Sequence, residues 1–266
     1  MTGKPMAAVC RTLKVARSTA YLRARPRKGT FYRRAEDTEV LYEILAVTRQ
    51  RASYGVRRTW AMVNRDRRER GEKPYNRKRI RRVMRMMELT LPGKLRRRMS
   101  RPHTGKIVMP DSNQRWCSDG FNIKCWNGEL VQVAFALDCH DREVLGHVGE
   151  ARALNGSDVR LLLDRSIWAR FGEAALKTPV QIQFLTDNGG PYVSVDTVLY
   201  AEALGFKPIT TPAYSPESNG MAEAFVNTIK RDYVGGSDLS DAQTVLRQIP
   251  GWLQDYNERA PHSALG

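Results

Sequence analysis

The charge of this 266-residue chain is distributed unevenly, and this limits how the chain can fold. Residues 1–110 contain 31 Lys and Arg against 8 Asp and Glu, a net charge of +23. Residues 111–266 contain 13 against 20, a net charge of −7. We therefore expect three parts: a basic helical region over 1–89, a basic linker over 90–112 and an acidic domain over 113–266. A basic region of this size attracts polyanions through binding that weakens with salt.

The basic region has the apolar periodicity of helices rather than the composition of a tail. Apolar side chains recur at helical spacing over 37–51, 56–70 and 77–88. Upstream, residues 9–25 contain a Ser-Thr pair that is typical of the start of the second helix in a helix-turn-helix. Short helices capped by Ser or Thr are also common elsewhere, so both interpretations stay open.

The third of these segments combines an apolar side with a cationic side. Its apolar residues recur at i, i+3, i+4 and i+7, as on a buried helix face: Ile80, Val83, Met84 and Met87. The cations are Arg77, Lys78, Arg79, Arg81, Arg82 and Arg85. A solvated helix face usually mixes both signs of charge, whereas no acid occurs in this segment before Glu88. We therefore expect the six cations to contact nucleic acid, as a helix in a major groove does.

The composition disfavours several classes of protein. No apolar run reaches the roughly 18 residues that a membrane helix needs. The first residues lack the apolar segment of a secretory signal, and the four cysteines show no C-x-x-C spacing. We expect reduced thiols in a cytoplasmic protein without a membrane partner.

Beyond residue 112 the sequence alternates between strand-like and helix-like segments. The expected strands cover 115–123, 130–138, 143–149, 180–186 and 207–211. The expected helices cover 158–171, 196–204 and 221–232. Three strands joined by tight turns, followed by alternating helices and strands, predict an α/β fold with a mixed five-stranded sheet and flanking helices.

Three carboxylates occupy positions at which α/β sheets build sites. Asp119 lies inside the first expected strand, Asp187 follows the fourth, and Glu223 begins the last helix, with 35 residues between the second and third acids. Asp187 could instead cap a turn, and Glu223 could only favour a helix N-terminus. Asp119 is harder to explain, because a carboxylate between Cys117 and Phe121 on one strand face is costly unless it is paired or binds a cation.

Six sequence motifs extend this pattern. They are SYGVRR at 53–58, YNRKRIRRVMRMMEL at 75–89, WCSD at 116–119, LTDNGGPY at 185–192, YSPESNGMAEAFVNTIK at 214–230 and YNERAPHSALG at 256–266. Together they closely resemble insertion-sequence transposases of the IS-three family, the second-reading-frame (OrfB-type) protein with a retroviral-integrase-like core. The resemblance covers nearly the whole chain. The residues that follow Asp119, Gly-Phe-Asn, depart from the commoner Ile-Thr-Tyr type of that family.

The resemblance implies an RNase H-like fold after a helix-turn-helix-type DNA-binding region, in a bacterial, nucleoid-associated protein. It also implies that Asp119, Asp187 and Glu223 are the catalytic and metal-binding residues. Oxygen ligands suit Mg²⁺ or Mn²⁺, and two such ions assist an in-line phosphoryl displacement. The expected reaction is strand cleavage at the terminal inverted repeats of the element, followed by attack of the freed 3′-hydroxyl on another phosphodiester.

Further residues and partners follow from the same resemblance and from the spacing on the last helix. Glu223, Asn227 and Lys230 fall at i, i+4 and i+7 on one helix face. We expect Lys230 and its neighbour Arg231 to hold DNA, although an ordinary exposed lysine is the plain alternative. Asn188 and Asn227 are expected to orient a ligand or a water. The expected partners are double-stranded DNA, both element ends and target, a second copy of the chain, and an upstream-frame protein or its frameshift fusion.

Two other functions stay open at this stage. One is an RNase H-fold nuclease that cuts without joining, which the large basic half disfavours. The other is a DNA-binding regulator with an inactive core, which the intact set of three acids disfavours.

Overall fold

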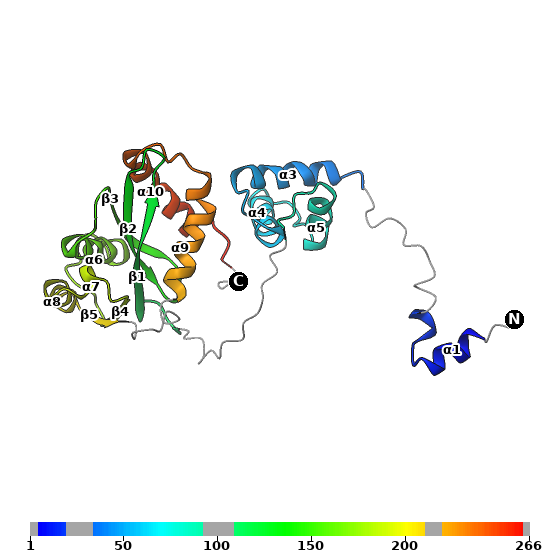
Figure 1. The fold of residues 1–266 in the computed structure, drawn as a ribbon, viewed down its shortest axis with the longest axis horizontal. Helices are drawn as coiled ribbons and strands as arrows, with labels where there is room; N and C mark the ends of the chain where they lie inside the picture. The colour runs from blue at the N-terminus through cyan, green and yellow to red at the C-terminus, as the bar shows by residue number, and fades with distance from the viewer. Residues whose placement is uncertain (1–4, 20–33, 93–108, 211–219, 263–266) are drawn as a thin grey trace. The chain divides into compact units, whose positions relative to one another are not determined.

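The computed structural model describes residues 5–19, 34–92, 109–210 and 220–262 (Figure 1). Contacts divide the chain into two units, Met1–Arg49 with Gly55–Leu91, and Gln50–Tyr54 with Pro92–Gly266. The predicted linker falls mainly on 93–108, outside the described residues, and the predicted helix-turn-helix is described only as far as Thr19. No helix in the described part of the chain is long and apolar enough to cross a membrane.

The first unit is helical. Its helices are α1 (Met6–Thr12), α3 (Asp37–Gln50), α4 (Val56–Glu69) and α5 (Arg77–Met86). The three periodic segments of the sequence are confirmed as α3, α4 and α5, and the predicted apolar side of α5 is buried at Ile80, Val83 and Met84. The prediction is wrong for Met87, which is 44% exposed. The helix ends before it, and Glu88 adopts a left-handed backbone with φ of 56°.

Polar contacts to Tyr75 fix the connection between α4 and α5. Asn64, buried in α4, accepts the Tyr75 N–H at 2.7 Å and donates to the Tyr75 carbonyl at 2.9 Å. Trp60 Nε1 donates to the same carbonyl at 2.8 Å, and the Arg67 guanidinium lies 3.8 Å from the centre of the Tyr75 ring. The next residue, Asn76, caps α5 by accepting a backbone N–H of its first turn at 2.8 Å.

The second unit contains a mixed five-stranded sheet of order β3-β2-β1-β4-β5. The strands are β1 (Arg115–Lys124), β2 (Leu130–Asp138), β3 (Val144–Glu150), β4 (Ile182–Thr186) and β5 (Phe206–Thr210). The first three pair antiparallel, whereas β4 pairs parallel with both β1 and β5. This sheet confirms the predicted RNase H-like α/β fold, and no expected strand end is displaced by more than two residues.

Helices cover both faces of this sheet (Figure 1). One face packs against α9 (Gly220–Asp232) and α10 (Ala242–Glu258), and the other against α6 (Gly156–Phe171) and α8 (Val195–Ala203). A four-residue helix, α7 (Gly190–Val193), follows β4. On the first face the Phe225 ring of α9 packs between Phe135 of β2, at 4.3 Å between ring centroids, and Tyr256 of α10, at 4.9 Å. Helix α10 was not predicted from the sequence.

Helix α6 approaches the sheet closely at Gly146 of β3. A Cβ atom added at Gly146 would lie 2.4 Å from Ser166 Oγ and 3.1 Å from Ser166 N. Ser166 is fully buried, and its hydroxyl donates to the Leu162 carbonyl at 2.7 Å. The backbone atoms of the helix cannot withdraw without moving α6, so this position requires glycine.

Replacing Gly146 by alanine should therefore destabilise the protein by about 1–3 kcal/mol through overpacking. Urea unfolding of the full chain measures this as a lower midpoint. The matched control is Gly120→Ala in β1, where the added Cβ would meet only the Val133 carbonyl, at 3.8 Å. Equal stability of the two variants would contradict the close packing of α6 on β3.

Candidate active site

The pairing of β1 with β4 places two of the three predicted acids side by side. The last pair of this parallel ladder joins Cys117 to Leu185. Asp119 lies two residues further along β1, and Asp187 directly follows the last residue of β4. Alternate residues of a strand share a face, so Asp119 lies on the face that α9 covers, where Cys117 and Leu185 are buried, and the charge of Asp187 acts on it.

Backbone N–H groups hold each of these two carboxylates. Asp119 Oδ1 accepts the N–H of Gly120 at 2.7 Å, and Asp187 Oδ1 accepts the N–H of Gly189 at 3.0 Å. A Cβ at Gly189 would lie 3.0 Å from that same Oδ1, so the turn after Asp187 favours glycine. Both aspartates are half-buried, which leaves part of each carboxylate accessible.

The third acid, Glu223, lies in the first turn of α9. This helix packs on the sheet through Ala222, Phe225 and Ile229, and Glu223 itself is exposed. The negative charges of Glu223 and Asp187 both raise the pKa of Asp119, so the three acids interact electrostatically. Within the described ranges, no three His, Cys, Asp or Glu side chains are grouped as the ligands of one metal ion.

Burial and charge act together on Asp119. Burial is the main cause that raises the pKa of this carboxyl above its ordinary value, and the two neighbouring acids add to it. The Gly120 N–H and the Lys230 ammonium act in the opposite direction. Lys230 Nζ lies 5.8 Å from the centre of the Phe121 ring, two residues along β1 from Asp119. The structure therefore brings Lys230 to the same site, as the spacing on α9 predicted.

A buried hydrogen bond that sequence reasoning missed joins the neighbours of the two aspartates. Ser118 in β1 is fully buried, and its Oγ lies 2.8 Å from the hydroxyl of Tyr192 in α7. Burial is the main cause that raises the pKa of Tyr192, and the charges of Asp119 and Asp187 raise it further. This bond links β1 to the segment after Asp187 just beyond the end of the β1–β4 ladder. Periodicity gives no signal for it, since Tyr192 belongs to a four-residue helix.

The other predicted residues of the second unit have different surroundings. Asn188 and Asn227 are exposed, next to Asp187 and on α9 respectively. Arg231 forms an ion pair with the buried carboxylate of Asp232, at 2.6 and 2.8 Å. Arg231 is therefore engaged within the fold, whereas the neighbouring Lys230 is exposed and its charge acts on Asp119.

The six predicted DNA-contacting residues of α5 also fall into two groups. Arg79 and Arg82 are half-buried and pair with acids at the start of α3. The other four are exposed and form no ion pair with any described residue: Arg77, Lys78, Arg81 and Arg85.

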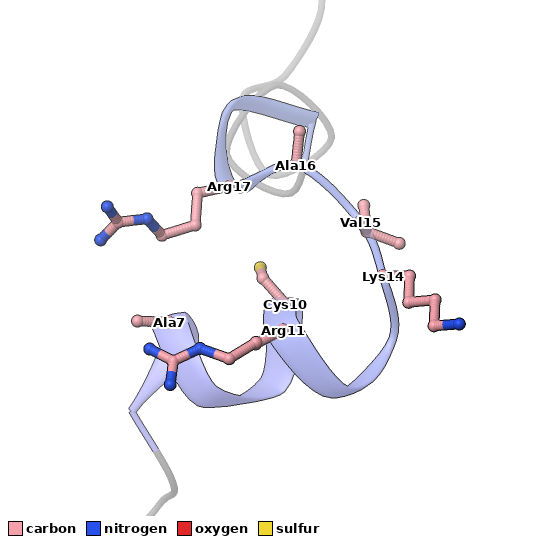
Figure 2. A pocket seen from close by; sticks show the side chains of 7 residues that line it. All are labelled: Ala7, Cys10, Arg11, Lys14, Val15, Ala16 and Arg17. Atoms are coloured by element: carbon pink, nitrogen blue, oxygen red, sulfur yellow. The ribbon is translucent and has the colours of Figure 1, made fainter.

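A shallow hollow lies between α1 and the turn that follows it (Figure 2). The buried Cys10 points into this hollow, and Lys14 in the turn has a left-handed backbone with φ of 51°. Its lining contains three cations and no acid: Ala7, Cys10, Arg11, Lys14, Val15, Ala16 and Arg17. The hollow therefore shares the basic character of this half of the chain.

The raised pKa of Asp119 predicts how stability depends on pH. A carboxyl that is more basic in the folded than in the unfolded state binds more protons when folded, so its contribution to stability falls as pH rises through its folded pKa. Asp119→Asn should therefore have a higher melting temperature than the unchanged protein at pH 7, by about 2–4 °C. The difference should shrink toward pH 4.

Calorimetric melting in metal-free buffer between pH 4 and pH 8 measures this difference. The control is Asp111→Asn, which removes an exposed carboxylate from the same unit. If the melting temperature of Asp119→Asn is not higher at pH 7, or if the difference is constant with pH, the assignment of a destabilising buried charge to Asp119 is wrong.

Comparisons with known proteins show which proteins this chain resembles. Two family profiles, both described as integrase core domain, match residues 110–216 and 204–266. The transposase InsD of insertion element IS2 from Escherichia coli is 40% identical over 263 residues, which is 97% of this chain and 87% of InsD. The uncharacterized protein Atu4601 of insertion element IS136 from Agrobacterium fabrum is 50% identical over 169 residues, 63% of this chain and 86% of that protein.

Among solved structures, the catalytic domain of Mos1 transposase, determined with Raltegravir and Mg, matches with a TM-score of 0.45 and 15% identity, over 55% of this chain and 80% of that chain. This chain matches InsD over nearly its whole length, and that match shows the family to which the chain belongs. With its integrase-type core, the chain belongs to the insertion-element transposases, which are DNA polynucleotidyl transferases.

Proposed function

We propose that Asp119, Asp187 and Glu223 are the catalytic residues of this transposase. The observation that carries the proposal is the pairing of β1 with β4, which brings Asp187, just after β4, near enough to Asp119 in β1 for its charge to act on that carboxyl. The charge of Glu223 acts on Asp119 from the helix that covers the same face. Such a set of acids serves cleavage at an element end and transfer of the resulting 3′-hydroxyl to another phosphodiester.

The donor set fits a hard divalent cation. The three side chains offer only carboxylate oxygens, which suit Mg²⁺ or Mn²⁺. Burial raises the pKa of Asp119 and the charges of the other two acids raise it further, and a bound cation would relieve their repulsion. Asp119 and Asp187 would hold the ions from the sheet, and Glu223 would complete the ligand set from α9. When bound, two ions supply stabilisation of the attacking and leaving oxygens.

The residues around the acids have separate roles in this proposal. Lys230, beside Phe121 and Asp119, holds a phosphate of the strand to be cut. Arg231 is occupied by Asp232, so its contribution to DNA binding is indirect. Asn188 and Asn227 are exposed near the acids and orient a ligand or a water.

The first unit supplies the affinity for DNA. Its charge and helices suit binding to the terminal inverted repeats of the element, and four cations of α5 are exposed for this purpose. Two ends must be joined in one reaction, so we propose that the protein acts as a homo-oligomer on double-stranded DNA. An upstream-frame protein, separate or as a frameshift fusion, is a further proposed partner.

A joining assay tests the catalytic proposal. The substrate is a short branched DNA that resembles a strand-transfer product, incubated with Mg²⁺ or Mn²⁺. The unchanged protein should resolve and rejoin it, whereas Asp187→Asn should bind it with equal affinity and show no chemistry, a loss of at least about 10³-fold. Mg²⁺ should also raise the melting temperature of the unchanged protein but not that of Asp187→Asn.

The possible outcomes separate the functions considered. Cutting without rejoining would favour a nuclease. Binding without chemistry, by the chain and by its fusion with an upstream frame, would favour an inactive regulator. Activity that survives in Asp187→Asn would refute the assignment of the catalytic acids.

Lys230 provides an independent test of the phosphate contact. Lys230→Gln should lower the rate of joining roughly 10- to 100-fold, because a positioned positive charge near the reacting phosphate is lost. Lys124→Gln is the matched control, since Lys124 is exposed at the end of the same strand as Asp119 but on the opposite face. Equal rates for the two variants would show that Lys230 is an ordinary surface lysine.

A further inference from the structure

The cations of α5 are arranged around the helix in two sectors. At 100° per residue, the exposed residues Arg77, Lys78, Arg81 and Arg85 fall within an arc of about 100°. We call these four residues the cationic stripe. The buried apolar residues of α5 fill a separate arc of about 100°, which borders the stripe on the side of Arg77. Arg79 and Arg82 lie in the gap on the other side of the stripe, Arg79 next to the apolar arc and Arg82 nearer to the stripe.

Arg82 is held by a buried acid. Its guanidinium makes a two-point contact with Asp37, NH1 to Oδ2 at 2.7 Å and NH2 to Oδ1 at 2.6 Å. The Asp37 side chain is only 7% exposed, and the pKa of its carboxyl is lowered to about 2, mainly by the hydrogen bond from Arg82. Asp37 also accepts the N–H of Arg34 at 2.8 Å. To reach a phosphate, Arg82 would have to leave a buried carboxylate without its cation.

Arg79 is held in a similar way. It pairs with Glu36 at 3.0 Å and lies 3.8 Å from Asp37, and its guanidinium stands 5.0 Å from the centre of the Tyr75 ring. Tyr75 is the residue that α4 fixes through Asn64 and Trp60. Both arginines therefore connect α5 to the rest of the first unit.

We propose that α5 contacts the DNA backbone only through the cationic stripe, and that Arg79 and Arg82 position the helix. The inference rests on the proposed binding of DNA by the first unit and refines it. From Arg77 to Arg85 the stripe spans about 12 Å, which is comparable to the width of the major groove. The stripe holds four positive charges and no acid, so a duplex backbone is the partner that its charge suits best.

Two variants that remove the same charge from the same helix test the proposal in the full chain. Arg81→Gln removes a member of the stripe, and Arg82→Gln removes a positioning residue. The probe is a fluorescent 40-base-pair duplex of mixed sequence, titrated between 50 and 200 mM salt, well below the melting temperature of each protein. Each phosphate contact adds about 0.9 to the slope of log K against log salt.

Arg81→Gln should weaken binding several-fold, lower the slope by about 0.9 and leave the melting temperature unchanged. Arg82→Gln should lower the melting temperature by several degrees and keep the slope of the unchanged protein. A lower slope for Arg82→Gln with an unchanged melting temperature would overturn the division of the six cations into a DNA-contacting stripe and two positioning arginines. An unchanged slope for Arg81→Gln would overturn it as well.

Asp37→Asn gives a second test, because it raises the net charge by one. If Arg82 positions the helix, this variant loses stability and its salt slope does not increase. If Arg82 is instead a phosphate contact restrained by Asp37, affinity and slope both rise, which would refute the inference. Absence of duplex binding by the unchanged protein would refute the proposed DNA-binding role of the first unit itself, whatever the behaviour of the variants.

Discussion

The parallel pairing of β1 with β4 is the contact on which the proposed active site depends. A shift of one residue in this pairing would turn the side chain of Asp187 to the opposite face of the sheet, away from Asp119. Several contacts oppose such a shift. Trp116 packs on Phe206 at 5.2 Å between ring centroids, and Arg115 Nε donates to Gln183 Oε1 at 2.7 Å across the two strands.

The fold holds these acids together against their repulsion. Apolar packing holds α9, which carries Glu223, against the sheet face that carries Asp119. The Phe135, Phe225 and Tyr256 rings are in contact in this packing. Burial is the main cause that raises the pKa of Asp119, and the charges of Asp187 and Glu223 add to it. Enzymes often retain such a locally unfavourable group because the chemistry requires it.

Local patterning predicts most of this fold. The strands of the second unit alternate or form short apolar runs between turn residues, and α3, α4 and α5 have clear apolar stripes, so both kinds of element are visible in the sequence. Helix α10 was missed because Pro250 and Gly251 interrupt its middle. Pro250 lies on the exposed side of the helix, and burial on the other side maintains it.

The sequence did not predict the contacts between residues that are far apart along the chain. The six cations of α5 are alike in sequence, and it is Glu36, 43 residues before Arg79, and Asp37, 45 residues before Arg82, that divide them. The bond between Ser118 and Tyr192 spans 74 residues and depends on the sheet register. The three acids are proposed as the site because their spacing matches a family motif, whereas the acids alone, without that motif, had plain alternatives.

Helix α9 carries Glu223 and Lys230 seven residues apart on one rigid element, with its apolar side fixed to the sheet. An insertion or deletion of a single residue between them would turn one relative to the other by about 100° and shift it by about 1.5 Å along the axis. Substitutions at exposed positions of this stretch disturb neither side chain. Exposed positions of this segment other than Asn227 are therefore free to vary during evolution, whereas its length is not, and natural variation in the length of this protein should fall outside it.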